Sequence, residues 1–306
     1  MRVHAKLRRV SPPSFPASPT LIRLVLRSVV GIAFLAAASS SFAASPTLER
    51  IKASGKVTFG YRDAAPPFSV RQRDGRVRGY SVELCERVAA EIARALKMPN
   101  LKTEWRPVDS ETRLSDVVAG KVDAECGTTT MTLARMERVD FSLPIFVDGG
   151  SALVRTGAFL RRWADFEGKR IAVIPATTTE AALKRALGVF GASARFVAVK
   201  DGEEGVALVL AGKADAYASD RMLLTQLKAA DARGDELEFV PSDFSFEPYA
   251  LVLPRNDADF RLLVNRTLTG LYKSGEIDGI FIRWLAPYGQ PGPLLNSMFY
   301  LNALPE

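Results

Sequence analysis

The chain has 306 residues, of which 41 are Lys or Arg, 34 are Asp or Glu and one is His, so its formal net charge is +7. Six of the basic residues and the single histidine, His4, precede residue 28, which leaves 35 basic and 34 acidic residues and a net charge of +1. This balance gives no reason to expect a nucleic-acid partner. The lack of imidazole after His4 excludes histidine-based catalytic triads and argues against a metal site of the zinc type.

Residues 1–43 have the pattern of a secretory signal peptide. Residues 2–27 carry only basic charges, residues 29–38 are apolar, and Ser41-Phe42-Ala43 is a small-x-small cleavage motif. The apolar stretch is too short to span a bilayer, although an uncleaved signal anchor is the alternative. We therefore expect an exported protein that begins near residue 44.

Predicted strands and helices alternate after the signal peptide. The first series has strands at residues 56–60, 101–107 and 121–125 and helices at residues 81–96 and 113–119. A second series has strands at residues 171–174, 195–199 and 213–218 and helices at residues 177–187 and 202–211. This alternation predicts an α/β protein with mostly parallel sheets flanked by helices.

Two segments, residues 114–124 and 207–216, echo each other, because each has a helix, then Gly-Lys, then a strand with Asp-Ala. We interpret this repetition as two similar α/β lobes rather than one continuous sheet. Residues 143–154 and 246–253 are expected to form two extended crossovers between the lobes. Residues 257–274 should form a helix, and residues 286–306 an irregular tail around the first lobe.

Cys85 and Cys126 are the two cysteines of the chain. An exported protein folds where disulfides can form, so a bridge between them is one expectation. Two buried thiols are the other, and the sequence does not choose between them.

The stretch from Cys126 to Arg135 contains four threonines and a guanidinium directly after a predicted strand. Thr132 is expected to cap a short helix, and Arg135 follows three residues later. Hydroxyls, backbone amides and a guanidinium are the donors that suit a carboxylate. The pattern predicts a small-anion site, and its alternative is an ordinary capped helix with a solvated arginine.

Several motifs follow one another along the chain, at Gly60–Phe68, Gly79–Ser81, Cys126–Thr130, Arg135, Asp140–Ser142, Ala176–Glu180 and Ala218–Asp220. Their order resembles that of the bacterial periplasmic amino-acid-binding proteins, the family-3 solute-binding components of ABC importers. Within that family the chain looks most like the glutamate/aspartate-binding branch. The resemblance runs from about residue 48 to residue 296 and covers essentially all of the chain after the signal peptide.

The resemblance implies a two-lobed fold of the type II periplasmic-binding-protein class, with two crossover strands and a ligand enclosed between the lobes. Residues 44–148 and 248–306 would form the first lobe, and residues 149–247 the second. It also implies a periplasmic monomer without a cofactor or covalent chemistry. Its partners would be a free amino acid and the membrane permease of an ABC importer.

Matching positions imply how the two ends of an amino acid would be held. Thr130 and Arg135 match residues that hold the α-carboxylate. Asp220 matches the residue that takes the α-ammonium, and a buried ammonium needs such an anionic partner. Thr128 would be a further acceptor for the ammonium.

Other matching positions concern the side chain of the ligand. Thr178, together with Thr177, would reach the carboxylate end from the second lobe, although both residues also suit a helix cap. Arg62, Ser110 and Arg113 match positions that hold a side-chain carboxylate, which implies an acidic ligand. Two arginines in one cleft repel each other unless an anion lies between them.

Two features leave the ligand less defined. Gly202 stands where the branch has a histidine that contacts the ligand, and its loss would enlarge the pocket or admit water. Phe68 could pack against the aliphatic part of the ligand or belong to the core.

The same fold also serves cyclohexadienyl dehydratases acting on prephenate or arogenate, which need a general acid. Glu180 is a candidate for that acid, although it also suits the first turn of a helix.

Overall fold

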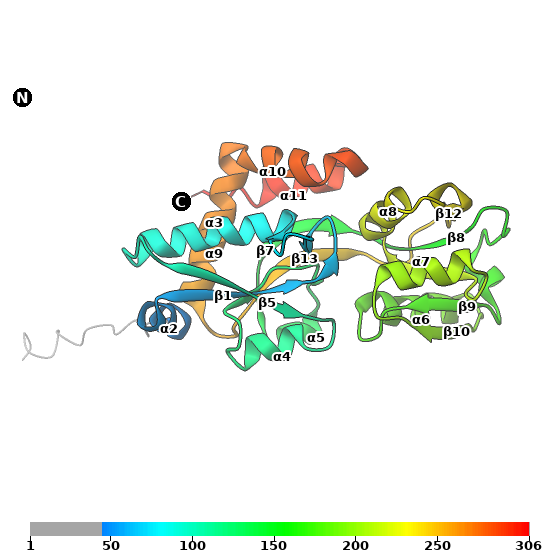
Figure 1. Ribbon diagram of the computed structural model, residues 1–306, viewed down its shortest axis with the longest axis horizontal. Coiled ribbons are helices and arrows are strands. Elements are labelled where there is room, and N and C mark those ends of the chain that lie inside the picture. The colour runs from blue at the N-terminus through cyan, green and yellow to red at the C-terminus, as the bar shows by residue number, and fades with distance from the viewer. Residues whose placement is uncertain (1–44, 306) are drawn as a thin grey trace, which may run out of the picture. The chain divides into compact units, whose positions relative to one another are not determined.

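Two five-stranded sheets organise residues 45–305, which are the residues that the computed structural model describes (Figure 1). The predicted signal peptide, residues 1–43, lies outside the described residues. The first sheet has the order β5-β1-β6-β13-β7, with strands Lys102–Val108, Lys56–Arg62, Ala124–Glu125, Glu247–Leu253 and Asp140–Asp148. The second has the order β10-β9-β11-β8-β12, with strands Arg195–Ala198, Arg170–Val173, Ala216–Asp220, Gly150–Arg155 and Leu237–Phe239.

Both sheets are mixed, which corrects the prediction of mostly parallel sheets. Strand β1 is parallel to β5 and β6, whereas β13 is antiparallel to β6 and β7. In the second sheet β9 is parallel to β10 and β11, whereas β8 is antiparallel to β11 and β12. Parallel neighbours need a crossover helix between them. The chain instead passes from β7 directly into β8 of the second sheet and returns through β13, which therefore runs antiparallel to β7.

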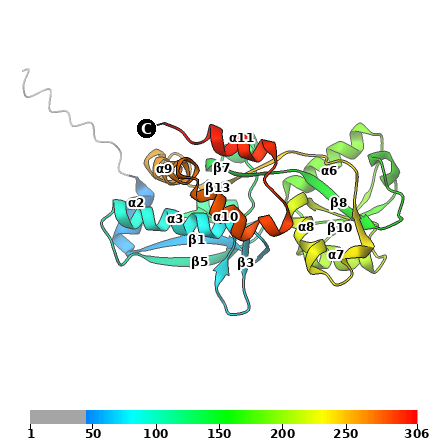
Figure 2. The same cartoon turned by 90° about the horizontal axis from the view of Figure 1, so that it is seen from above.

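Helices cover both faces of the first sheet. They are α2 (Pro46–Ser54), α3 (Tyr80–Ala95), α4 (Arg113–Val118), α5 (Leu133–Met136), α9 (Ala258–Ser274), α10 (Glu276–Trp284) and α11 (Pro293–Leu301). Figure 1 shows α3 and α9 on the face opposite α4, and Figure 2 looks onto the side that carries α3, α9, α10 and α11. Successive residues of a strand point to opposite faces. Accordingly Leu251 and Leu253 join the core under α3 and α9, and Ala250 and Val252 join the core under α4.

The second sheet follows the same two-faced plan with α6 (Thr178–Val189), α7 (Gly202–Leu210) and α8 (Arg221–Ala230). Ala216 and Ala218 of β11 pack in the core that contains Leu183 of α6. Tyr217, which lies between them in the sequence, packs in the core that contains Val206 of α7. The two lobes therefore have the same layered construction, with α6 on one face of the second sheet and α7 on the other.

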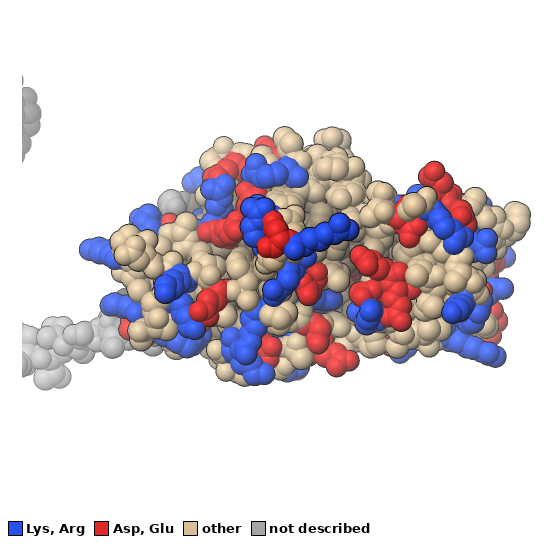
Figure 3. Space-filling view, viewed as in Figure 1, with Lys and Arg blue, Asp and Glu red and all other residues tan. Residues whose placement is uncertain are grey.

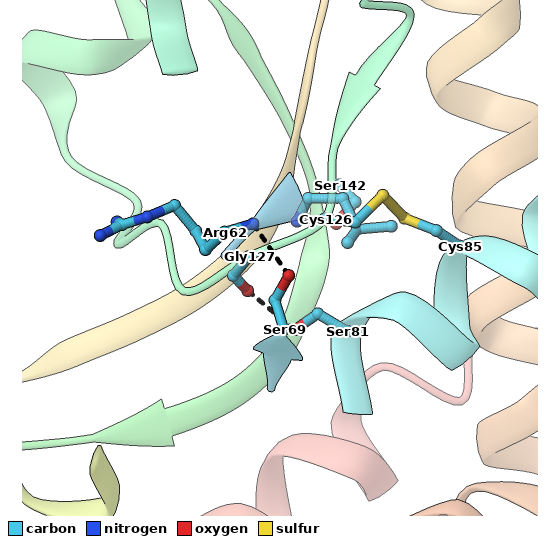
Figure 4. The surroundings of a disulfide bond; sticks show 8 residues. Arg62, Ser69, Ser81, Cys85, Cys126, Gly127 and Ser142 are labelled. Carbon is cyan, nitrogen blue, oxygen red and sulfur yellow. Dashed lines mark hydrogen bonds between the residues drawn. A yellow bond between two sulfur atoms is a disulfide. The ribbon is translucent and has the colours of Figure 1, made fainter. Parts of the chain in front are cut away.

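Cys85 of α3 and Cys126, the residue after β6, form a disulfide (Figure 4). The bridge settles the two alternatives that the sequence left open. Beside it the Ser81 hydroxyl donates a hydrogen bond to the carbonyl of Gly127 at 2.7 Å. The disulfide and this hydrogen bond tie the N-terminal part of α3 to the chain that leaves β6.

A small antiparallel sheet of β2 (Ala64–Ala65), β3 (Ser69–Arg71) and β4 (Val77–Arg78) lies between β1 and α3 in the sequence.

The C-terminal segment differs from the predicted irregular tail, because residues 293–301 form helix α11. Its apolar side chains Leu295, Met298 and Phe299 pack in the core of the first lobe. Pro293 occupies the first helical position, where a proline costs no hydrogen bond. The Pro- and Gly-rich composition of the segment thus concealed an amphipathic helix.

No helix within residues 45–305 is long and apolar enough to cross a membrane. On the face drawn in Figure 3, basic and acidic side chains lie interspersed.

Candidate functional site

One cavity is lined by residues from both lobes, many of them at or just after the end of a strand. Six of the predicted site residues line it, namely Arg62, Arg113, Thr128, Thr177, Thr178 and Asp220. Its apolar wall includes Ala65, Pro66 and Leu223, and Gln226 adds an amide. Residues from distant parts of the chain therefore meet at one place.

The positions of these residues in the fold explain their convergence. Arg62 ends β1, Thr128 lies three residues after the end of β6, and Asp220 ends β11. Thr177 is the N-cap of α6, and its hydroxyl accepts a hydrogen bond from the backbone of Glu180. Ligands of α/β folds bind where strands end and helices begin, and this cavity follows that rule.

The first-lobe part of the cavity is rich in arginine. Arg113 is only 3% exposed, and its Nε has no hydrogen-bond partner within residues 45–305. Burial and the charges of Arg62 and Arg135 together lower the pKa of Arg113 to about 9, against the opposing charges of Glu125 and Asp220. An anion in the cavity would relieve this repulsion and give Arg113 an acceptor.

Glu125 is a buried acidic neighbour that the sequence did not single out. It is fully buried at the end of β6, where the Thr129 hydroxyl is close enough to lower its pKa but neither carboxylate oxygen has a well-aligned hydrogen-bond partner among the described residues. Burial raises the pKa of Glu125, and the charge of Arg113 opposes that rise. Glu125 thus brings a negative charge close to Arg113 without giving the Arg113 Nε a hydrogen-bond acceptor.

The second-lobe part of the cavity is acidic. Asp220 accepts a hydrogen bond from the Thr179 hydroxyl at 2.8 Å and another from the hydroxyl of Tyr249. Burial and the charge of Glu247 raise the pKa of Asp220 to about 6, although the hydrogen bonds from the two hydroxyls oppose this rise. A carboxylate has about four acceptor positions, so Asp220 can also accept from an ammonium.

A second carboxylate, Asp148, is partly buried at the end of β7, next to the crossover. It accepts hydrogen bonds from the backbone N–H groups of Met222 at 3.0 Å and Gly149 at 2.9 Å. Burial and the negative charge of Asp220 together raise the pKa of Asp148 to about 7, although the two backbone hydrogen bonds oppose this rise. The carboxylates of Asp148 and Asp220 therefore repel each other when both are ionised.

Thr130 and Arg135 do not line this cavity. Thr130 lies in an adjoining cavity with Thr178 and Glu247. Arg135 Nη1 donates to the carbonyl of Thr130 at 2.7 Å, and Thr132 caps helix α5 as the sequence predicted. The predicted carboxylate donors are thus adjacent to the cavity, but the Arg135 guanidinium is turned to the backbone.

Ser110 and Phe68 also lie outside the cavity lining. The Ser110 hydroxyl donates to the carbonyl of Pro175, in the second lobe, at 3.0 Å. Phe68 is completely buried and contacts the rings of Tyr80, Phe146 and Tyr249. Of its two interpretations the structure assigns Phe68 to the core, because the aromatic cluster encloses its ring.

The space beside Gly202 is filled rather than enlarged. A Cβ atom on Gly202 would lie 2.5 Å from Leu227 Cδ1 and 3.3 Å from the Tyr217 hydroxyl. Both residues line the cavity. Leu227, on helix α8, therefore fills the space into which a side chain at residue 202 would point. The expectation that a glycine at residue 202 enlarges the pocket is thus corrected.

Within residues 45–305, no group of three His, Cys, Asp or Glu side chains is arranged to hold a metal ion. The residues that the sequence missed at the site are Glu125, Asp148, Gln226, Leu227, Glu247 and Tyr249. Glu247 alone gave a local signal, because it is a charged residue at the start of the apolar run Tyr249–Leu253.

The chain is similar to known proteins over most of its length. The sequence profile of the bacterial extracellular solute-binding proteins, family 3, matches residues 57–287. The L-glutamate/L-aspartate-binding protein of Pseudomonas aeruginosa is 32% identical over 270 residues, which cover 88% of each chain. The glutamate/aspartate import solute-binding protein of Salmonella typhimurium is 30% identical over 265 residues, which cover 87% of each chain. A solved ancestral amino acid-binding protein, a precursor of cyclohexadienyl dehydratase, has a TM-score of 0.68 and 25% identity over 78% of this chain and 99% of that one.

Proposed function

Because this chain belongs to family 3 of the bacterial extracellular solute-binding proteins, we propose that it binds an acidic L-amino acid, glutamate or aspartate, between its two lobes. It then delivers this ligand to the membrane permease of an ABC importer. The observation that carries the proposal is the buried Arg113, which lines the same cavity as Arg62 and whose Nε has no hydrogen-bond partner among the described residues. A side-chain carboxylate would supply the missing acceptor and neutralise the repulsion.

The other predicted contacts support the same ligand class. Asp220 lines the cavity and is ionised above its pKa of about 6, so it suits an α-ammonium. Thr128 lies on the same cavity and would accept from that group. Thr130, Arg135 and Thr178 would hold the α-carboxylate after they exchange their present partners. Two relatives that are at least 30% identical are named as binding proteins for glutamate and aspartate.

The remaining assignments follow from the family and the sequence. Residues 1–43 would be removed as a signal peptide, and the mature protein would act as a monomer in the periplasm. Its first lobe would comprise residues 44–148 and 248–306, and its second residues 149–247. The ligand would be recognised without a cofactor and without covalent chemistry.

Two contacts of Glu180 count against a dehydratase. One Glu180 carboxylate oxygen accepts from the backbone of Ala176 at 3.2 Å, and the other accepts from Lys184 Nζ at 2.7 Å. These contacts hold Glu180 at the start of α6, and it does not line the cavity. Formation of phenylpyruvate from prephenate by the purified protein would contradict the receptor proposal.

Thermal unfolding with a panel of amino acids tests the ligand class. A ligand at 100 times its dissociation constant stabilises a protein by about 2.7 kcal/mol, which corresponds to a shift of about 5–10 °C for a chain of this size. We expect glutamate or aspartate to raise the midpoint and basic amino acids to leave it unchanged. If neither acid shifts the midpoint, the proposal fails.

A further inference from the structure

Glu247 begins β13, the strand by which the chain returns to the first sheet, and it is only 1% exposed. Its Oε2 accepts hydrogen bonds from the hydroxyls of Thr130 at 2.6 Å and Thr178 at 2.8 Å. Its Oε1 accepts from the Ser245 hydroxyl at 2.6 Å. One carboxylate oxygen therefore receives a hydroxyl from each lobe.

The protons of these two threonines are already used. A hydroxyl has one proton to donate, so a threonine that donates to Glu247 cannot donate to a second carboxylate at the same time. The oxygens of Thr130 and Thr178 lie 3.3 Å apart, which places both beside the same acceptor. A ligand carboxylate that approached them would meet another negative charge and no free hydroxyl proton.

The charge of Glu247 also reaches the neighbouring arginine. Burial lowers the pKa of Arg135, and the negative charges of Glu125, Glu247 and Asp220 oppose that effect. Glu247 therefore acts on three groups at once, namely Thr130, Thr178 and Arg135. These are the groups that the family resemblance assigns to the α-carboxylate of the ligand.

We propose that Glu247 is an internal competitor of the ligand, whose carboxylate holds Thr130 and Thr178 until the α-carboxylate of the amino acid displaces it. This inference rests on the proposed function, since it requires an amino-acid ligand. It makes Glu247 a residue that sets affinity without contributing a contact to the bound ligand. The cost of displacing Glu247 is the same for every α-amino acid, because all of them share the α-carboxylate.

The variant Glu247→Gln removes the charge and keeps the size of the side chain. Isothermal titration calorimetry should show that its dissociation constants for glutamate, aspartate and glutamine all fall by a similar factor, about threefold to tenfold. Glu137→Gln, at an exposed position after α5, is the matched control and should bind as the wild type does. An unchanged or weaker affinity of Glu247→Gln overturns the inference. Weaker affinity would mean that Glu247 accepts from the α-ammonium instead.

A double-mutant cycle separates competition from a general effect on folding. Thr178→Val removes one of the two hydroxyls, so the gain from Glu247→Gln should shrink in the Thr178→Val background. A structural effect of Glu247→Gln would be the same in both backgrounds and would overturn the inference. If the wild type binds no amino acid in the same titrations, the proposed function itself fails, which is a distinguishable result.

A crystal structure of the wild-type protein with bound glutamate provides a test that does not depend on a variant that folds. The hydroxyls of Thr130 and Thr178 should lie within hydrogen-bond distance of the ligand α-carboxylate. Glu247 Oε2 should have left both of them. Hydroxyls that still donate to Glu247 in the liganded protein would overturn the inference.

Discussion

The hydroxyl of Tyr249 donates a hydrogen bond to Asp220, although the two residues belong to different sheets. Tyr249 lies on β13, the returning crossover, and Asp220 ends β11 in the second lobe. The proposed ammonium acceptor is therefore connected to the strand that joins the lobes. Its protonation should affect both ligand binding and the stability of the crossover.

Ligand affinity should depend on pH through Asp220. Burial raises the pKa of Asp220 to about 6, and an ammonium needs the ionised carboxylate. The dissociation constant for glutamate should therefore rise as the pH falls from 8 to 5, whereas the ligand keeps its charges over that range. Calorimetric titrations at several pH values measure this change.

Asp220→Asn is the matching variant for that experiment. It should bind weakly at pH 8 and lose the pH dependence. A wild-type dissociation constant that is the same at pH 5 and pH 8 would mean that Asp220 does not take the ammonium.

The stability of the ligand-free protein should depend on pH through Asp148. Burial raises the pKa of Asp148 to about 7, well above that of an Asp in an unfolded chain, which is about 3.9. Its contribution to the free energy of unfolding is therefore complete below about pH 4 and is lost as the pH rises through 7. Urea denaturation of wild type and Asp148→Asn should show a smaller loss in the variant between pH 5 and 8. Parallel curves for the two proteins would contradict the assignment.

Removal of the disulfide should destabilise the first lobe. Cys85 and Cys126 are 41 residues apart, and closure of a loop of this length stabilises a protein by about 2–4 kcal/mol. The double variant Cys85→Ser/Cys126→Ser should therefore unfold at a lower urea concentration. Addition of a reductant should lower the stability of the wild type and leave that of the variant unchanged. Equal stability of the two proteins would show that the bridge adds nothing.

A histidine at residue 202 should fit the wild-type chain only if the Leu227 side chain moves. Its Cβ would lie 2.5 Å from Leu227 Cδ1, and such overpacking costs about 1–3 kcal/mol. Gly202→His should therefore lower the unfolding midpoint, and Leu227→Ala in the same chain should restore part of it. Thermal unfolding of the two single variants and the double variant measures the coupling. Additive effects of the two substitutions would mean that Leu227 does not fill the space beside Gly202.

Much of the fold could be predicted because its signals are local. Leu251, Val252 and Leu253 point alternately into two cores, as residues of a strand do. The Gly-Lys pairs in the repeated segments 114–124 and 207–216 each mark the end of a helix before a strand. The direction of β13 could not be predicted, because strand pairing depends on the path of the chain between the lobes. Helix α11 was missed because the Pro- and Gly-rich residues at 289–293 concealed the apolar residues that follow.

The candidate site was predictable only where a family motif marks it. Arg113 and Asp220 are ordinary charged residues by composition, and the resemblance alone identified them. Glu247 was missed because its partner Thr130 lies 117 residues earlier in the chain, and no local pattern indicates that contact. Leu227 was missed for a similar reason, since only the packing of α8 against α7 brings it to Gly202.

The central claim, that the cavity selects an acidic side chain through Arg113, is tested most directly by calorimetric titration of glutamate and glutamine into wild type and Arg113→Met. The wild type should bind glutamate at least about tenfold more tightly than glutamine, because only the acid supplies an anion to the arginines. Arg113→Met should reduce this ratio towards one, while Arg138→Ala, at an exposed position after α5, should keep it. Equal binding of acid and amide by the wild type, or a ratio that Arg113→Met leaves unchanged, would contradict the claim.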